Sequence, residues 1–100
     1  MATTTKALVR AAAATSSATL YTVPASTTTV ITNIVVTNTA GSAGTFTLLL
    51  DDVSIATTVS VGANDSTIID LKQVLATTKT IKGFASATTI NFHISGVEIA

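Results

Sequence analysis

Apolar and polar residues alternate along much of the chain with a period of two, which is the pattern of half-buried β-strands. Phe46, Leu48 and Leu50 are each separated by one residue, so this pattern predicts that they share one buried face. The segment 55–61 alternates in the same way, with its apolar odd-numbered residues predicted to point inward. The pair Asp51–Asp52 between these segments predicts a tight turn, and therefore a β-hairpin.

Further strands follow from runs of threonine, valine and isoleucine, whose branching at Cβ favours extended backbone. Turns are predicted at the Pro-Ala-Ser step 24–26, at 40–44, where two glycines can adopt positive φ, and at 62–66. The stretch 71–78 is the least strand-like and is compatible with a loop or a single helical turn. The predicted strands cover residues 20–23, 28–39, 45–50, 55–61, 67–71, 78–85 and 90–99.

The last strand contains a change of phase. Ile90, Phe92 and Ile94 share one face, but the next large apolar residues, Val97 and Ile99, have the opposite parity. One extra residue would restore the alternation, so we predict a β-bulge at Ser95–Gly96.

About seven to eight short strands separated by turns predict an all-β fold, a single antiparallel β-sandwich. An up-and-down barrel is the alternative. Residues 1–17 fit the pattern poorly and are predicted to form an N-terminal arm, with strand character near Lys6–Arg10, preceding a sandwich domain at 18–100. The run from Val30 to Val36 is apolar on both faces, which is typical of a strand covered on both sides, within the core or by a second subunit.

Composition points to assembly with other protein. Twenty-two of the 100 residues are threonine, only 10% are charged, and the formal net charge is zero. An isolated domain usually carries about 25% charged residues and a net charge, because neutral surfaces promote association. The chain has no cysteine, so a disulfide framework and thiolate metal sites are excluded.

The charge distribution also limits the partners. Five basic residues are dispersed between Lys6 and Lys82, and no tryptophan offers a stacking platform, so we expect no nucleic-acid partner. No apolar segment approaches the roughly 18–20 residues that span a bilayer, and we expect no membrane partner. Lys6 and Arg10 could anchor the arm on an acidic partner or could simply keep it soluble.

Residues with catalytic or ligand-binding potential are few. His93 is the only histidine and belongs to the face opposite Phe92, so we interpret it as a surface or subunit-interface residue rather than a general base. Asp51–Asp52 and Asn64–Asp65 could bind calcium only if their two turns converged, and both pairs are typical turn residues. Asn64-Asp65-Ser66 also matches a glycosylation sequon. We therefore assign no catalytic, cofactor-binding or metal residues and expect no enzyme.

Four segments in order resemble small structural proteins of tailed-bacteriophage particles. They are TLYTVPA at 19–25, VITNIVVTNTAGSAGTFTLLL ending at Leu50, ANDST at 63–67 and INFHISGVEIA at 90–100. The chain departs from that pattern at 50–55, where a tight turn replaces a longer insertion. The resemblance covers about four fifths of the chain.

The resemblance implies a jelly-roll-like sandwich and a virion protein without catalytic residues. It implies a trimeric capsid decoration or cement protein on the outer capsid surface, whose partners are the major capsid protein and further copies of itself. A tail, neck or fibre-associated adaptor is the alternative. A carbohydrate-binding module is a weaker one, because such sites stack sugars on exposed aromatic rings and the chain has only Tyr21 and three phenylalanines.

Overall fold

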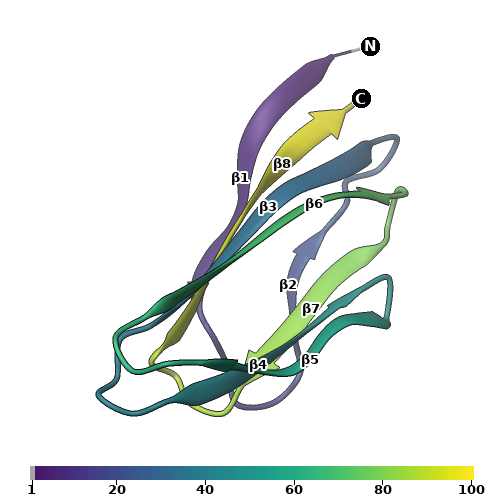
Figure 1. Ribbon diagram of the computed structural model, residues 1–100. Coiled ribbons are helices and arrows are strands. Elements are labelled where there is room, and N and C mark those ends of the chain that lie inside the picture. Colours follow the sequence, from purple (N-terminus) through teal and green to yellow (C-terminus); the bar gives the residue numbers. More distant parts are fainter. Residues whose placement is uncertain (1) are drawn as a thin grey trace.

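The computed structural model describes residues 2–100 and consists of two antiparallel four-stranded sheets that pack face to face (Figure 1). Within these residues no helix is present, and therefore none that could cross a membrane. The all-β sandwich expected from the sequence is confirmed. The strands are β1 (Thr3–Ala12), β2 (Ala18–Thr22), β3 (Thr28–Asn38), β4 (Gly44–Leu50), β5 (Val53–Val61), β6 (Ser66–Leu75), β7 (Thr80–Ala85) and β8 (Ile90–Ile99).

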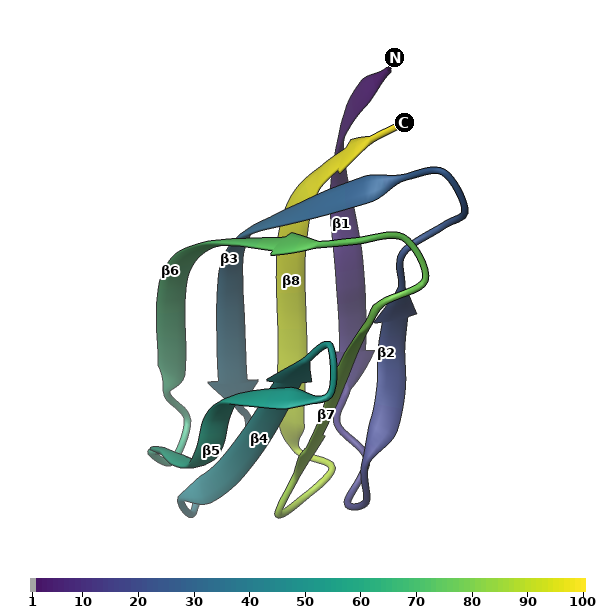
Figure 2. The ribbon, with the colours of Figure 1, turned by 90° about the vertical axis from the view of Figure 1, so that its right-hand side faces the viewer.

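The strand order is that of a jelly roll. The first sheet has the order β1-β8-β3-β6 and the second β2-β7-β4-β5, so every connection except the β4–β5 hairpin passes from one sheet to the other (Figure 2). An up-and-down barrel would instead pair successive strands. β5 and β6 are edge strands on one side of the sandwich, and β1 and β2 are the edge strands on the other.

The core lies between the two inner faces. Phe46, Leu48 and Leu50 are all buried, as the alternation in this segment predicted. The ring of Phe46 meets that of Phe92 from the opposite sheet edge to face, with centroids 6.1 Å apart and planes at 73°. This is a favourable geometry for two aromatic quadrupoles and joins the two sheets at the centre of the core.

Strand β5 differs from the simple alternation predicted for residues 55–61. Thr58 has φ 49°, and two residues, Thr57 and Thr58, stand opposite the single Thr47 of β4. The backbone N–H of Thr58 donates to the Thr47 hydroxyl at 3.1 Å, which stabilises this bulge. The bulge reverses the phase, so Ala56 rather than Ile55 is buried and the prediction for Ile55 was wrong.

The prediction that placed a β-bulge at Ser95–Gly96 was also wrong. The extra residues lie in the two neighbouring strands, Leu8 in β1 and Thr32 in β3, at the same level of the sheet. β8 itself stays in phase, with Gly96 buried after Ile94. The inner face therefore continues to Glu98, and not to Val97 and Ile99.

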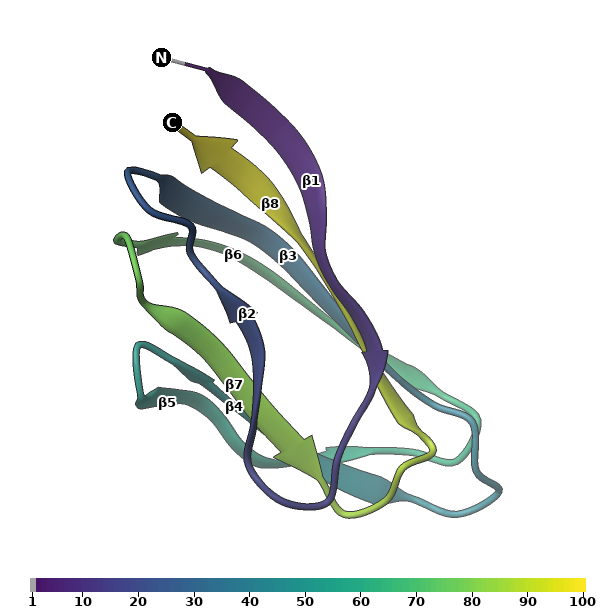
Figure 3. The same cartoon turned by 180° about the vertical axis from the view of Figure 1, so that it is seen from behind.

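The segment expected to be an arm is largely a strand. Residues 3–12 form β1, which pairs along the whole of β8, so the two terminal strands run side by side (Figure 3). Leu8 and Val9 are buried in the core. The strand character expected near Lys6–Arg10 is present, and residues 3–12 belong to the sandwich instead of preceding it.

Other connections follow the predicted turns with two differences. Residues 71–75, whose sequence is compatible with a loop or a single helical turn, instead continue β6. Glycine does not provide positive φ at any described position, and turn residues such as Asp51, Asp52 and Asn64 do so instead. Two consecutive positive φ values at Asp51 and Asp52 match the twist of a two-residue hairpin loop.

Candidate interaction surfaces

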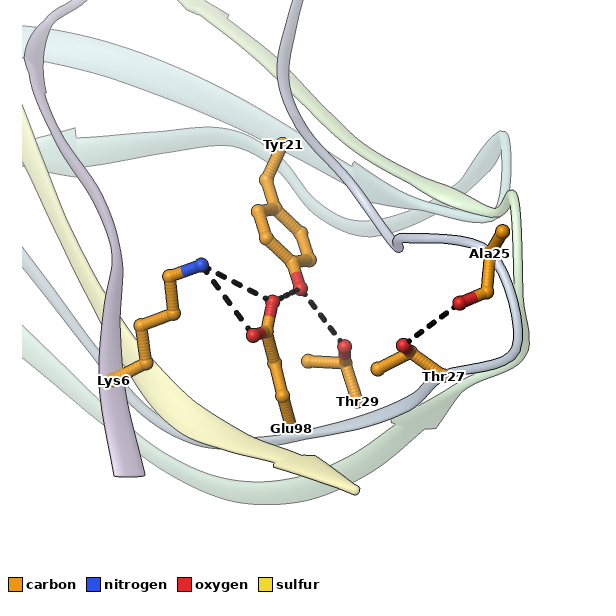
Figure 4. A network of polar contacts seen from close by, with 6 residues as sticks. All are labelled: Lys6, Tyr21, Ala25, Thr27, Thr29 and Glu98. Atoms are coloured by element: carbon orange, nitrogen blue, oxygen red, sulfur yellow. Dashed lines mark hydrogen bonds and ion pairs between the residues drawn. The ribbon is translucent and has the colours of Figure 1, made fainter. Parts of the chain in front are cut away.

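A polar network connects the sheets where the apolar core ends (Figure 4). The Tyr21 hydroxyl of β2 donates to the Glu98 carboxylate of β8, because an ionised carboxylate can only accept. The Thr29 hydroxyl, 2.9 Å away, consequently donates to the Tyr21 oxygen. Lys6 of β1 completes the network with its ammonium group 3.4 Å from Glu98. Side chains from four strands of the two sheets thus form one connected network.

The network holds its groups in fixed protonation states. Burial and the neighbouring Glu98 carboxylate raise the pKa of Tyr21 to about 12. The hydrogen bond from Tyr21, with Lys6 beside it, lowers the pKa of Glu98 below its ordinary value, although partial burial opposes this. At neutral pH the tyrosine is a donor and the glutamate a charged acceptor, so the network suits a structural tie rather than proton transfer.

Gly96 explains how Glu98 reaches the inner face. A Cβ at this position would lie 2.3 Å from the carbonyl oxygen of Val30 and 2.9 Å from a methyl carbon of Leu8. Only glycine permits the close approach of β8 to the bulges of β3 and β1. Sequence reasoning missed this network because it inserted the bulge into β8. The sequence did contain one signal, because Glu98, the only glutamate, has the same parity as Ile94 and therefore belongs to the inner face if β8 keeps its alternation.

The residues considered for chemistry do not come together. His93 is exposed on the outer face of the first sheet, where Arg10 is its cross-strand partner. The turns at Asp51–Asp52 and Asn64–Asp65 lie at opposite ends of β5, which separates them along its length. Across residues 2–100 no group of three or more potential metal-ligating side chains occurs.

Basic side chains are mostly neutralised by nearby carboxylates. Lys79 lies 3.6 Å from Asp51 and Lys82 lies 2.6 Å from Asp52, in addition to the contact of Lys6 with Glu98. The pairs of Lys79 and Lys82 share the Asp51–Asp52 turn, whereas that of Lys6 lies at Glu98, and each lysine has a carboxylate of its own. Arg10 is exposed and has no ion-pair partner within the described part of the chain.

The clearest contact surface is apolar and lies along the β5–β6 side of the sandwich. Val53 is 69% exposed, Ile55 37%, and Ile68 and Val74 66% each. We call these four residues the β5–β6 apolar edge. A small hollow of about 210 Å³ lies beside Val53 and Ile55, which line it together with Leu50, Ser54 and Gln73. Sequence reasoning missed this edge because the β5 bulge turns Ile55 outward.

A second hollow lies on the outer face of the first sheet, where β1 and β3 bulge beside β8. It has a volume of about 480 Å³ and is open to solvent. Hydroxyl, methyl and cationic groups all line it. We call it the β1–β8 hollow; it is lined by Thr5, Lys6, Ala7, Arg10, Thr32, Ser95, Gly96 and Val97.

Comparison with known proteins adds no relative. The chain matches no protein-family model and no curated protein sequence. The expectation of a phage particle protein therefore continues to rest on the four resembling segments and stays a hypothesis.

Proposed function

We propose that the chain is a non-enzymatic structural protein of tailed-phage particles, a capsid decoration or cement protein that bridges neighbouring capsomers on the outer capsid surface. Its partners in this proposal are the major capsid protein and two further copies of itself in a homotrimer. The single observation that carries the proposal is the β5–β6 apolar edge, since several exposed large aliphatic side chains on edge strands are typical of a surface covered by protein.

The outer faces fit the same role. Thr19 and Thr22 on β2, Ser60 on β5 and Thr28 on β3 are all exposed, so uncharged hydroxyl side chains cover much of the surface. Such a surface can hydrogen-bond to a neighbour without charge repulsion. Burial of apolar area contributes about 25 cal/mol per Å² before ordering costs, and this term adds up over the many copies of a shell.

The mechanism makes attachment insensitive to ionic strength, because screening weakens exposed charge pairs but not apolar contacts. Particles washed in high salt should therefore keep the protein. Release of the protein by salt alone would contradict this mechanism.

Copy number separates the two structural roles. A cement protein occupies every capsomer joint and requires hundreds of copies per particle, whereas a tail, neck or fibre adaptor requires a handful. Quantitative gel densitometry of purified particles against the major capsid protein measures this ratio. A handful of copies would replace the cement role with the adaptor role.

The carbohydrate-binding alternative loses its main candidate residue. Tyr21 is half-buried and its hydroxyl is engaged with Glu98 and Thr29, so its ring is not an exposed platform for a sugar. No observation on the described residues favours this alternative over a structural role.

A further inference from the structure

The outer face of the first sheet carries opposite charges at its two edges. Cross-strand partners place Arg10 of β1 in one row with His93, Val35 and Ile68. Asp70 of β6 lies in the adjacent row of the same face. The strand order puts β1 and β6 three strand spacings apart, about 14 Å. Arg10 and Asp70 therefore cannot reach each other within one chain.

Each of these charges is exposed and lacks an ion-pair partner among residues 2–100. Their surroundings are complementary as well. Asp70 stands between Ile68 and Val74, two large side chains that project from β6 into solvent. Arg10 stands at the wall of the β1–β8 hollow, which is concave and contains no carboxylate. A ridge that carries the unpaired Asp70 carboxylate thus matches a hollow that carries the unpaired Arg10 guanidinium.

We propose that the β1–β8 hollow of one copy receives the β6 ridge of a second copy, with the Asp70 carboxylate pairing with the Arg10 guanidinium. This inference rests on the self-association in the proposed function and names the contact that produces it. The two surfaces are different parts of the same outer face, so the pairing can form reciprocally about a two-fold axis or head to tail around a ring. The homotrimer of the proposed function requires the head-to-tail ring, in which three copies bury every ridge and every hollow.

Lys72 is the other exposed charge of β6 and serves as a matched control. It lies where the β3–β6 pairing is irregular, with residues 71 and 72 skipped between paired positions. Lys72→Gln removes a charge next to Asp70 but leaves the proposed pair intact.

The test is a charge-reversal cycle measured by sedimentation velocity and light scattering. The wild type should have the mass of three copies. Arg10→Glu and Asp70→Arg should each raise the dissociation constant roughly tenfold or more. The double variant, which exchanges the two charges, should recover most of the loss, and Lys72→Gln should remain assembled. Circular dichroism of each variant verifies that it is folded.

The outcomes separate the contact from the function. If the wild type is assembled but the single variants also stay assembled, this contact is wrong. It is also wrong if the double variant does not recover assembly. In both cases self-association itself is still supported. Dissociation by Lys72→Gln to the same extent as Asp70→Arg would likewise overturn this contact. A monomeric wild type overturns both the contact and the homotrimer, while attachment to the shell is judged separately by copy number.

Discussion

The Tyr21 hydroxyl of one sheet donates a hydrogen bond to the Glu98 carboxylate of the other, where Glu98 stands opposite Thr4 of β1. Apolar packing joins the sheets through Phe46 and Phe92 farther inside. The polar contact extends this attachment to the terminal strands, because Lys6 of β1 binds the same carboxylate. The attachment of the terminal strands therefore depends on a few identifiable polar groups.

Tyr21→Phe should destabilise the fold by about 1–3 kcal/mol, since it removes the donor and leaves a mostly buried carboxylate with fewer partners. Glu98 is only 14% exposed, so water replaces the lost bond incompletely. Urea unfolding followed by circular dichroism measures the effect. Thr19→Val, on the exposed side of the same strand, is the control and should change little. Equal stabilities of Tyr21→Phe and wild type would show that the tie contributes nothing.

The contribution of this network to folding stability should be lost at both low and high pH. The pKa of Glu98 is lower in the folded state than its ordinary 4.5, so its stabilising contribution is complete above that value and is lost as the pH falls through the folded pKa. The pKa of Tyr21 rises from 10.0 to about 12, so its contribution is present below pH 10 and disappears between about 10 and 12. Unfolding of wild type and Glu98→Gln across pH measures the loss at low pH, because their difference should shrink below pH 4.5. A difference that is constant down to pH 2 would refute this assignment.

Gly96→Ala should destabilise the protein by about 1–3 kcal/mol or more, as overpacking against backbone does. The added methyl would lie 2.3 Å from the Val30 carbonyl oxygen, which can move only with its strand. Gly41→Ala is the control, because nothing lies within 4 Å of a Cβ at that turn. Thermal melting compares the two. Similar melting temperatures for both variants would contradict the close approach of β8 to β3.

Asn38→Ala should cost about 1–3 kcal/mol, because it leaves buried backbone groups without partners. The Asn38 amide nitrogen donates to the carbonyl oxygens of Ser42 at 2.8 Å and Val61 at 3.3 Å, and its oxygen accepts from the Ala40 N–H. Asn33→Ala on the same strand is the control, since its side chain makes no hydrogen bond within residues 2–100. Chemical unfolding should place Asn33→Ala within about 0.5 kcal/mol of wild type. If Asn38→Ala proved equally neutral, the hydrogen bonds of Asn38 to the backbone of Ala40, Ser42 and Val61 would not contribute to stability.

Much of the fold could be predicted because its signals are local. The alternation of Phe46, Leu48 and Leu50 identifies a buried face without knowledge of any neighbour. The aspartate pair at 51–52 identifies a hairpin turn by its tolerance of positive φ. Strand number and turn placement then predict a sandwich.

The candidate surfaces could not be predicted in the same way because they depend on pairing between distant segments. The phase of β5 changes at Thr58, whose partner is the Thr47 hydroxyl of another strand. The inner position of Glu98 depends on extra residues in β1 and β3, which periodicity within β8 does not contain. One-residue shifts exchange inner and outer faces, so small register differences decide which side chains meet a partner.

Cryo-electron reconstruction of the intact particle tests the central claim most directly. The account predicts density for a jelly-roll sandwich repeated over the outside of the icosahedral shell at the joints between capsomers, with the β5–β6 apolar edge covered by protein. Density confined to the tail or neck, or a particle that lacks the protein, would contradict the claim of a capsid cement protein.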